Sequence, residues 1–323
     1  MMHTTKELQK KVQEIFDNKN YLAEPQGLYE PIQYSLSQGG KRLRPLLALM
    51  GSSVFGGDLE KVVNPAIGLE IFHNFTLLHD DIMDQAPIRR GVASVYKKWD
   101  TNTAILSGDT MFVLAYDYVT NSDPSFLIDV LRVFNQTARE VCEGQQYDMN
   151  YETQEVVNVD DYVEMIRLKT AVLIAAALKI GAITAKASKE DAQNIYDFGI
   201  NIGLAFQLRD DLLDAFGDQK VFGKPIGNDI VTNKKTYLYI MAYDRANTKQ
   251  REALDRAYSL DNNEDKITEV MKVFRELNIR EVTEKMIDDY YQKSLVYLDA
   301  ISVVKEQKSE LYSFAKGLSL REV

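Results

Sequence analysis

The sequence has few of the residues that build cysteine-rich or turn-rich proteins. Its 323 residues include 1 cysteine, 17 glycines and 7 prolines. The lone Cys142 cannot form an intramolecular disulfide, and without a cysteine cluster a zinc-finger or iron–sulfur site has no ligands. The low glycine and proline contents argue against collagen-like, low-complexity and turn-dense all-β structures. They favour a helix-rich globular protein, and the single cysteine indicates a reducing compartment.

Long apolar runs and an excess of positive charge are also missing. The longest apolar run, residues 171–178, is far shorter than the roughly 18 to 20 residues needed to span a bilayer. Residues 1–20 lack the apolar core of a signal peptide. We therefore expect a soluble, cytoplasmic protein with no integral membrane segment. The net charge of −10 and the pI near 5.0 argue against nucleic acid as a partner.

Apolar residues recur at helical spacing along most of the chain. Between residues 68 and 86 they recur at intervals of three and four until Pro87 interrupts the pattern, and residues 191–216 repeat it. No strand-like alternation is convincing, and no segment has the composition of a domain linker. The pattern predicts an all-α fold with a single domain over residues 1–323, a helical bundle whose site lies between facing helices. Further helices are expected at residues 43–54, 103–120, 126–149, 159–185, 236–259, 266–277 and 283–305.

Two aspartate clusters, at residues 80–84 and 210–214, share the pattern D-D-x-x-D inside apolar helical segments. On a helix the first and last aspartates of a cluster lie on one face, where their like charges repel. Clustered carboxylate oxygens suit a hard cation such as Mg²⁺, and two facing clusters would hold metal ions for a diphosphate. The alternative is a solvated acidic face, to which we assign the similar cluster at residues 160–164. The candidate metal ligands are Asp80, Asp81, Asp84, Asp210, Asp211 and Asp214.

Basic residues gather near these clusters although the protein is acidic overall. One group lies at the start of an apolar helix, where backbone N–H groups also favour anions, and the others follow each aspartate cluster. Each group alone is typical of a solvated basic loop. Together they suit phosphate oxygens and suggest two anionic substrates. The candidates are Lys41, Arg42, Arg44, Arg89, Arg90, Lys224, Lys234 and Lys235.

Two histidines lie in the same segment as the first cluster. His73 lies two helical turns before Asp80 on about the same face, so it could reach a phosphate. A buried structural role is the alternative for both His73 and His79.

The order and spacing of these motifs resemble the trans-isoprenyl diphosphate synthases of the polyprenyl synthetase family, over nearly the whole chain. The resemblance implies an all-α bundle around a deep central cavity and a homodimer. It also implies that isopentenyl diphosphate is joined to an allylic diphosphate with Mg²⁺, three ions per site when substrate is bound. The matching motifs are residues 39–45, Glu70-x-x-His73, 79–84, Arg89-Arg90-Gly91, Gly108-Asp109, Lys169-Thr170, Phe206-Gln207-x-x-Asp210-Asp211-x-x-Asp214, Gly223-Lys224 and Lys234-x-Thr236.

The resemblance also implies a role for each site residue. Direct metal ligands would be Asp80, Asp84 and Asp210, with Asp81, Asp211 and Asp214 nearby or bound through water. The allylic diphosphate would be held by Arg89, Lys169, Lys224 and Lys234, and isopentenyl diphosphate by Lys41, Arg44, His73 and Arg90. Thr170 and Gln207 would line the space where the allylic cation forms. Two loop positions depart from the family pattern: Asn233 and Asp100 stand where the family usually has glycine.

Product length depends on the residues that precede the first cluster. Phe72, Phe75 and Thr76 share the face of the ligands, toward the start of their helix. They are either core residues or the floor of the product site. By resemblance, a bulky aromatic five residues before the cluster marks short-chain synthases, so we expect a C20 or C15 product. The alternatives are a longer-chain synthase, a terpene cyclase, which uses one diphosphate, and a non-catalytic partner subunit.

Overall fold

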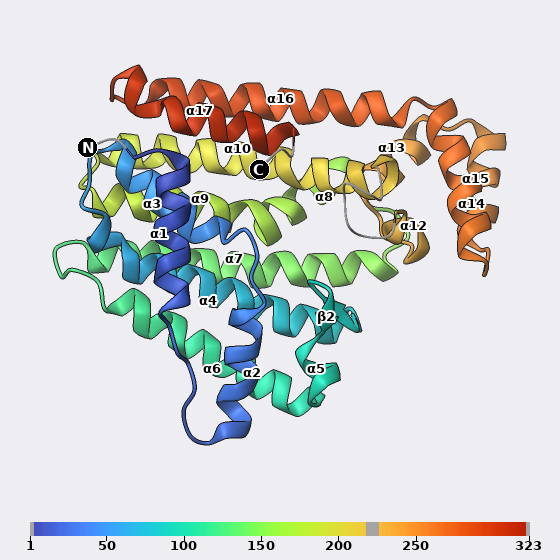
Figure 1. Cartoon of the computed structure of the whole chain (residues 1–323). Coiled ribbons are helices and arrows are strands. Elements are labelled where there is room, and N and C mark those ends of the chain that lie inside the picture. The colour runs from blue at the N-terminus through green and yellow to red at the C-terminus, as the bar shows by residue number, and fades with distance from the viewer. Residues whose placement is uncertain (1–2, 218–225, 321–323) are drawn as a thin grey trace. The chain divides into compact units, whose positions relative to one another are not determined.

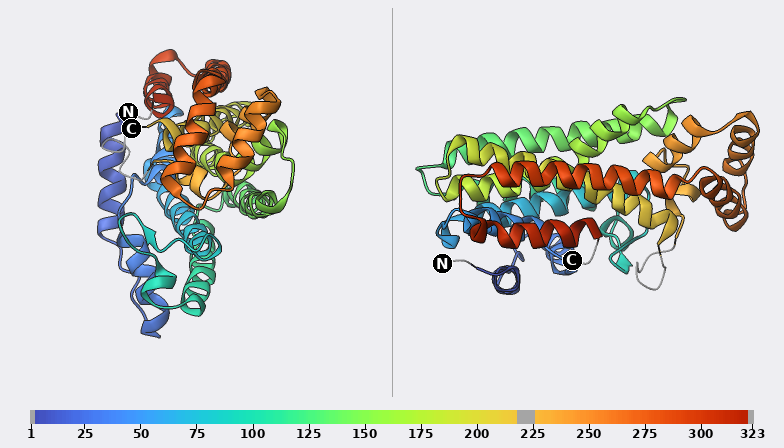
Figure 2. Two further views of the ribbon diagram at one scale, coloured as in Figure 1. Left: turned by 90° about the vertical axis from the view of Figure 1, so that its right-hand side faces the viewer. Right: turned by 90° about the horizontal axis from the view of Figure 1, so that it is seen from above.

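The computed structural model describes residues 3–217 and 226–320, and helices dominate these residues (Figures 1 and 2). The predicted all-α fold is confirmed. None of the described helices is both long enough and apolar enough to cross a membrane. The elements are α1 (Thr5–Asp17), α2 (Gln26–Ser37), α3 (Leu43–Val54), α4 (Leu59–Met83), β1 (Ile88–Arg89), β2 (Val92–Ala93), α5 (Val95–Lys98), α6 (Thr101–Thr120), α7 (Leu127–Thr153), α8 (Val159–Ile166), the π-helix η1 (Arg167–Ala171), α9 (Val172–Thr184), α10 (Lys189–Phe216), α12 (Asn228–Val231), α13 (Tyr237–Arg245), α14 (Thr248–Tyr258), α15 (Asn263–Glu276), α16 (Ile279–Ala300) and α17 (Lys305–Leu320).

The contacts group the chain into two compact units, of which the first includes α1 to α6 and shorter parts of later helices. Its central element is α4, which packs along α6 and α3 (Figure 1). Asp58 caps the start of α4, because its side chain accepts the N–H of Glu60. Apolar side chains surround most of α4, as expected for a helix enclosed by neighbours. This packing fixes the end of α4, where the first aspartate cluster lies.

A short antiparallel hairpin follows α4, which corrects the expectation of a chain without strands. β1 pairs with β2 through Ile88 opposite Ala93 and Arg89 opposite Val92. The two turn residues, Arg90 and Gly91, both have positive φ. This conformation matches the twist of two-residue hairpins. The strands are too short to show alternation in the sequence.

The second unit includes α8, η1 and α12 to α16. The sequence predicts one helix over residues 159–185, but a π-helical segment at Arg167–Ala171 interrupts it. This segment packs tightly against α7, since a Cβ placed on Gly144 would lie 2.3 Å from the backbone nitrogen of Lys169. Single π turns of this kind often occur at functional sites.

The helix expected at residues 236–259 is wrong in its length. Two helices occupy this range, because α13 ends at Arg245 and α14 begins at Thr248. Asn247 accepts the backbone N–H of Gln250, whose side chain accepts the N–H of Asn247 in return. This capping box starts a new helix inside a pattern that looks continuous.

Candidate functional site

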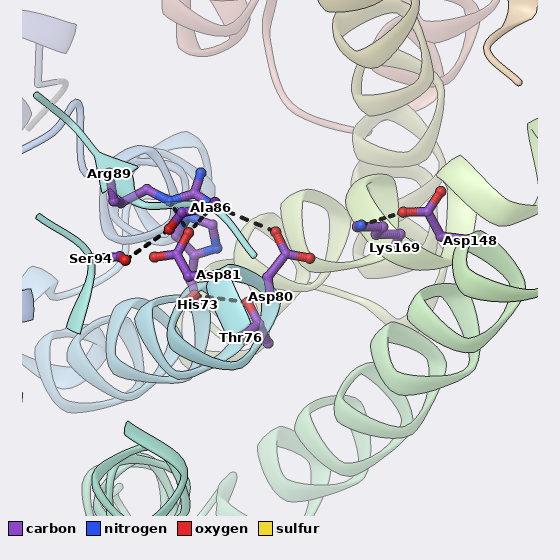
Figure 3. A network of polar contacts seen from close by, with 9 residues as sticks. All are labelled: His73, Thr76, Asp80, Asp81, Ala86, Arg89, Ser94, Asp148 and Lys169. Atoms are coloured by element: carbon purple, nitrogen blue, oxygen red, sulfur yellow. Dashed lines mark hydrogen bonds and ion pairs between the residues drawn. The ribbon is translucent and has the colours of Figure 1, made fainter. Parts of the chain in front are cut away.

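The first aspartate cluster lies at the C-terminal end of α4. Arg89, from β1, binds Asp81 Oδ1 through Nε at 2.8 Å and through Nη2 at 2.5 Å. The same Nη2 lies 3.7 Å from Asp80 Oδ2, and Figure 3 shows the guanidinium directed at these carboxylates. Asp84 is the C-cap residue, and its N–H donates to the Asp80 carbonyl at 2.8 Å. The two outer aspartates are therefore one helical turn apart.

Burial separates the middle aspartate of this cluster from the outer two. Asp81 is 4% exposed, whereas Asp80 is half-buried and Asp84 is exposed. Burial raises the pKa of the Asp81 carboxyl, and the Arg89 guanidinium opposes that shift. Asp81 is thus committed to an internal ion pair. The outer carboxylates are the better placed of the three for a metal ion.

The second aspartate cluster lies at the C-terminal end of α10. Its middle residue, Asp211, is 6% exposed and accepts the Tyr162 hydroxyl on Oδ2 and Gln207 Nε2 on Oδ1 at 3.1 Å. Asp214 Oδ2 accepts the backbone N–H of Asp229 at 3.0 Å. Burial, followed by the Asp229 carboxylate, raises the pKa of Asp211 to about 8. Tyr162 and Gln207 oppose this shift.

The oxygen donors of both clusters are of the kind that binds a divalent cation, although no three His, Cys, Asp or Glu side chains among the described residues are already gathered around one point. All six candidate ligands offer oxygen, which suits Mg²⁺. The second cluster holds buried carboxylates next to one another, and an opposite charge nearby favours their ionised form. A bound cation would supply that charge.

Lys169 and Thr170 both lie in the π-helix η1. Lys169 Nζ lies 2.6 Å from Asp148 Oδ2 of α7, and Figure 3 shows the two side chains directed at each other. Thr170 Oγ1 donates to Gln207 Oε1 at 3.1 Å, so the two residues expected to line one space are neighbours. Lys234 borders a small cavity together with residues of the second cluster. Lys224 lies outside the described residues.

Three further residues belong to the second unit's site and were missed in the sequence. They are Asp148, which pairs with Lys169, Tyr162, which binds Asp211, and Asp229, which lies beside both Asp211 and Asp214. Asp229 could have been suspected as a carboxylate just before Lys234. Tyr162 lies inside the near-match cluster 160–164, whose aspartates lie in the first turn of α8. No spacing signal points to Asp148.

The basic candidates near residue 40 form a second group in the first unit. Arg90 Nη1 donates to the Gly39 carbonyl at 2.6 Å. Burial and the positive charges of Arg44 and Arg90 lower the pKa of His73 well below its ordinary value. His73 is therefore a neutral donor or acceptor beside two guanidinium groups. Lys41 is exposed on the same loop.

The three product-length candidates lie in an aromatic cluster of α4 and α6. Phe75 stacks on Phe112 with ring centroids 5.1 Å apart, and Phe72 packs against both rings. Phe72 is fully buried, whereas Phe75 is half-buried. The Thr76 hydroxyl donates to the His73 carbonyl at 2.8 Å. His79 packs against Phe75 and contacts the Ile105 carbonyl, so its placement is structural.

Both departures from the family pattern have a structural role. The carboxylate of Asp100 caps α6, because it accepts the N–H of Thr103 at 2.9 Å. Asn233 has a φ of 57°, a left-handed conformation that asparagine adopts more readily than most residues. Its side chain accepts Lys266 Nζ at 3.1 Å. Neither departure disturbs an aspartate cluster.

Comparison with known proteins agrees with this arrangement. The polyprenyl synthetase family model matches residues 25–277. A geranylgeranyl diphosphate synthase of Methanosarcina mazei is 40% identical over 223 residues, 68% of this chain and 69% of that protein. A crystal structure of a geranylgeranyl pyrophosphate synthase has a TM-score of 0.94 and 44% identity, and covers 98% of this chain and 99% of its own. The Corynebacterium glutamicum geranylgeranyl pyrophosphate synthase complexed with isoprenyl diphosphate and magnesium has a TM-score of 0.86 and 28% identity, over 98% of each chain. This chain belongs to the polyprenyl synthetase family.

Proposed function

We propose that the protein is a Mg²⁺-dependent prenyltransferase that condenses isopentenyl diphosphate with dimethylallyl, geranyl or farnesyl diphosphate. The product is a short-chain trans-prenyl diphosphate, C20 or C15, with C20 favoured. One observation carries the proposal: a family match over residues 25–277 includes two complete aspartate clusters, each at the end of a long helix. The geranylgeranyl synthases among its relatives support the C20 product.

The chain's own residues suit an ionisation, condensation and elimination sequence. When the allylic C–O bond breaks, the electron pair stays on the diphosphate, where negative charge develops. Mg²⁺ held by Asp80, Asp84 and Asp210, with the other cluster residues nearby, would stabilise that charge. Arg89, Lys169 and Lys234 would bind the same diphosphate, since Arg and Lys suit phosphate oxygens. Lys224 belongs to this group by its place in the sequence.

The second substrate supplies the electrons for the new bond. Lys41, Arg44, Arg90 and His73 would hold isopentenyl diphosphate, whose double bond attacks the allylic carbon. A proton then leaves the condensed cation for the departing diphosphate. Thr170 and Gln207 would line the space where the cation forms.

The aromatic cluster supports a short product. Phe75 lies between one and two helical turns of about 5.4 Å before Asp80, and Phe112 backs its ring at 5.1 Å. A chain that grows from the first cluster toward the start of α4 would meet this pair early. We therefore propose Phe75 as the floor of the product site, with Phe72 behind it.

A homodimer is part of the proposal. Ile105, Leu106 and Val113 of α6 are 42%, 58% and 61% exposed. Their spacing places them on one side of the helix, and apolar side chains grouped at a surface favour a partner. We also propose that residues 1–323 act as one domain, because the family match extends over residues of both units.

Product sizing tests the function. Purified protein is incubated with Mg²⁺, labelled isopentenyl diphosphate and each allylic starter, and the products are separated by length. We expect a main product of C20 or C15 that requires isopentenyl diphosphate. Turnover of an allylic diphosphate alone would indicate a terpene cyclase, and no prenyl product would indicate a partner subunit.

The floor is tested by Phe75→Ala, which should lengthen the main product by one or more isoprene units. Phe126→Ala is the control, since Phe126 is a buried aromatic of the first unit outside this cluster. An unchanged product distribution in Phe75→Ala, or a wild-type product of C30 or longer, would place the floor elsewhere.

A further inference from the structure

The basic group of the first unit contains a buried carboxylate that the proposed reaction does not use. Glu70 of α4 is 3% exposed, and its Oε2 is buried without a hydrogen-bond partner among the described residues. Asn74, 2% exposed, lies one helical turn further along α4. Its Nδ2 donates to the Glu70 carbonyl at 2.8 Å and to Oε1 at 3.3 Å. These bonds fix the orientation of the Asn74 amide.

The other end of that amide faces Arg90. Arg90 Nη1 lies 3.5 Å from Asn74 Oδ1 and donates to the Gly39 carbonyl at 2.6 Å. The loop before α3 also closes on this guanidinium, because a Cβ on Gly40 would lie 3.1 Å from Arg90 Cζ. Arg90 is therefore held between the loop and α4. Asn74 is the link from Arg90 to the buried Glu70.

Glu70 also counters the repulsion among the arginines of this group. Burial raises the pKa of Glu70, while Arg44, Arg90 and Arg42 each lower it. Burial and the charge of Arg90 lower the pKa of Arg44, and Glu70 opposes that shift. Arg44 Nε is buried without a hydrogen-bond partner among the described residues. A buried carboxylate beside two guanidinium groups favours the charged form of each. It also reduces the repulsion between them, so that they can lie close together.

We propose that Glu70 and Asn74 are positioning residues for the diphosphate of isopentenyl diphosphate. Glu70 offsets the repulsion between Arg44 and Arg90, and Asn74 orients Arg90, so both cations are in place before the substrate binds. This inference rests on the proposed function of the Arg44 and Arg90 group. If Glu70 only added negative charge near an anion site, removing that charge would tighten diphosphate binding. Our proposal predicts weaker binding instead.

Calorimetric titration of inorganic diphosphate into the full chain in EDTA tests the inference without turnover. Without metal ions, cationic side chains must bind the diphosphate. The difference in binding heat between wild type and Arg44→Gln gives the binding that is due to this arginine group. We expect Glu70→Gln to weaken that part about tenfold, which corresponds to roughly 1.4 kcal/mol. Glu70→Asp should retain most of the affinity. Unchanged or tighter binding in Glu70→Gln would overturn the proposal.

Steady-state kinetics give a second readout, for which a buried carboxylate of the same unit is the control. Asn74→Ser keeps the charge and removes the link to Arg90, so KM for isopentenyl diphosphate should rise about fivefold or more while kcat and KM for the allylic substrate change less than about twofold. Asp191→Asn is the matched control: Asp191 is a buried carboxylate of the same unit, 8% exposed, that binds Ser188 and Ser302. Equal effects of Asn74→Ser on both KM values would contradict positioning. If wild type makes no prenyl product, the proposed function fails, while the diphosphate titration still tests Glu70.

Discussion

The two aspartate clusters have the same sequence pattern and a different electrostatic environment. In each, the middle aspartate is the most buried, with Asp81 4% and Asp211 6% exposed. Asp81 binds a guanidinium, that of Arg89. Asp211 binds two neutral donors, the Tyr162 hydroxyl and the Gln207 amide. Among the described residues, the middle carboxylate therefore bonds to a cation in the first cluster and to neutral donors in the second.

A further carboxylate widens this difference. Burial is the largest cause of the raised pKa of Asp211, and the Asp229 carboxylate is the second. The backbone N–H of Asp229 also donates to Asp214. Carboxylates close together in a low-dielectric setting destabilise one another unless a cation lies between them. We therefore predict that, among the described residues, Asp211 gains more than Asp81 from a bound cation. Sequence similarity between two motifs does not imply equal demand for metal.

The largest effect is expected on turnover, where the clusters should behave alike. Asp80→Asn and Asp210→Asn each remove a proposed metal ligand and should lower kcat by about three orders of magnitude or more, because metal ions stabilise the leaving group by several kcal/mol. Steady-state kinetics with Mg²⁺ measure this. Asp160→Asn is the control and should retain activity, because Asp160 is an exposed residue of the near-match cluster. Near-normal activity in Asp80→Asn would remove the first cluster from the mechanism.

The free energy of unfolding should then distinguish the two clusters, because substitution of the middle aspartate is expected to change it in opposite directions. In metal-free protein, Asp81→Asn should lower the free energy of unfolding by about 1.5–3 kcal/mol, because it removes the negative charge to which the Arg89 guanidinium is hydrogen-bonded. Asp211→Asn should raise the unfolding free energy by roughly 1 kcal/mol, or about 1–2 °C in Tm, because it relieves repulsion among carboxylates. Thermal unfolding in EDTA measures both. A loss of stability in both variants would mean that the clusters are electrostatically equivalent.

A smaller effect on stability is expected at Tyr162, one of the two neutral donors to Asp211. Tyr162→Phe removes the hydroxyl bonded to Asp211 and should lower the free energy of unfolding by about 0.5–1.5 kcal/mol. The rise in Tm on adding Mg²⁺ should become larger, because the carboxylate has lost one of its donors. Tyr151→Phe is the control, since the Tyr151 hydroxyl makes a long bond of 3.4 Å to the backbone carbonyl of Asp161 and, within the described residues, none to a carboxylate of the second cluster. An identical response of the two variants would argue against a special role for Tyr162.

The fold could be predicted where local periodicity decides it. The expected helix at residues 43–54 coincides with α3, because a run of apolar side chains from Leu46 to Met50 makes most of this helix buried. The range 236–259 was mispredicted because the capping box at Asn247 is a local polar signal within continuous apolar spacing. The two-residue strands of the hairpin carry no periodic signal.

The site could be predicted where its chemistry is local in sequence. Both aspartate clusters and the adjacent Arg89 follow from spacing alone, and the bond between Arg89 and Asp81 joins residues only eight positions apart. Tyr162 and Asp148 could not be found this way, because each meets its partner through helix packing across 49 and 21 residues of chain. A π-helix at Arg167–Ala171 brings Lys169 and Thr170 to their partners, and no propensity rule predicts it there. Contacts of this kind can be identified only once the three-dimensional fold is known.

The most direct test is the Mg²⁺-dependent stability of two double variants without substrate. Thermal unfolding is recorded with EDTA and with saturating Mg²⁺ for wild type, Asp80→Asn/Asp84→Asn and Asp210→Asn/Asp214→Asn. Ligand at about 100 times its Kd stabilises a protein by about 2.7 kcal/mol, so a bound ion is measurable. The rise in Tm on adding Mg²⁺ should persist in the first double variant and disappear in the second. A rise lost only in the first double variant, or no rise in wild type, would contradict the assignment of the greater cation demand to the second cluster.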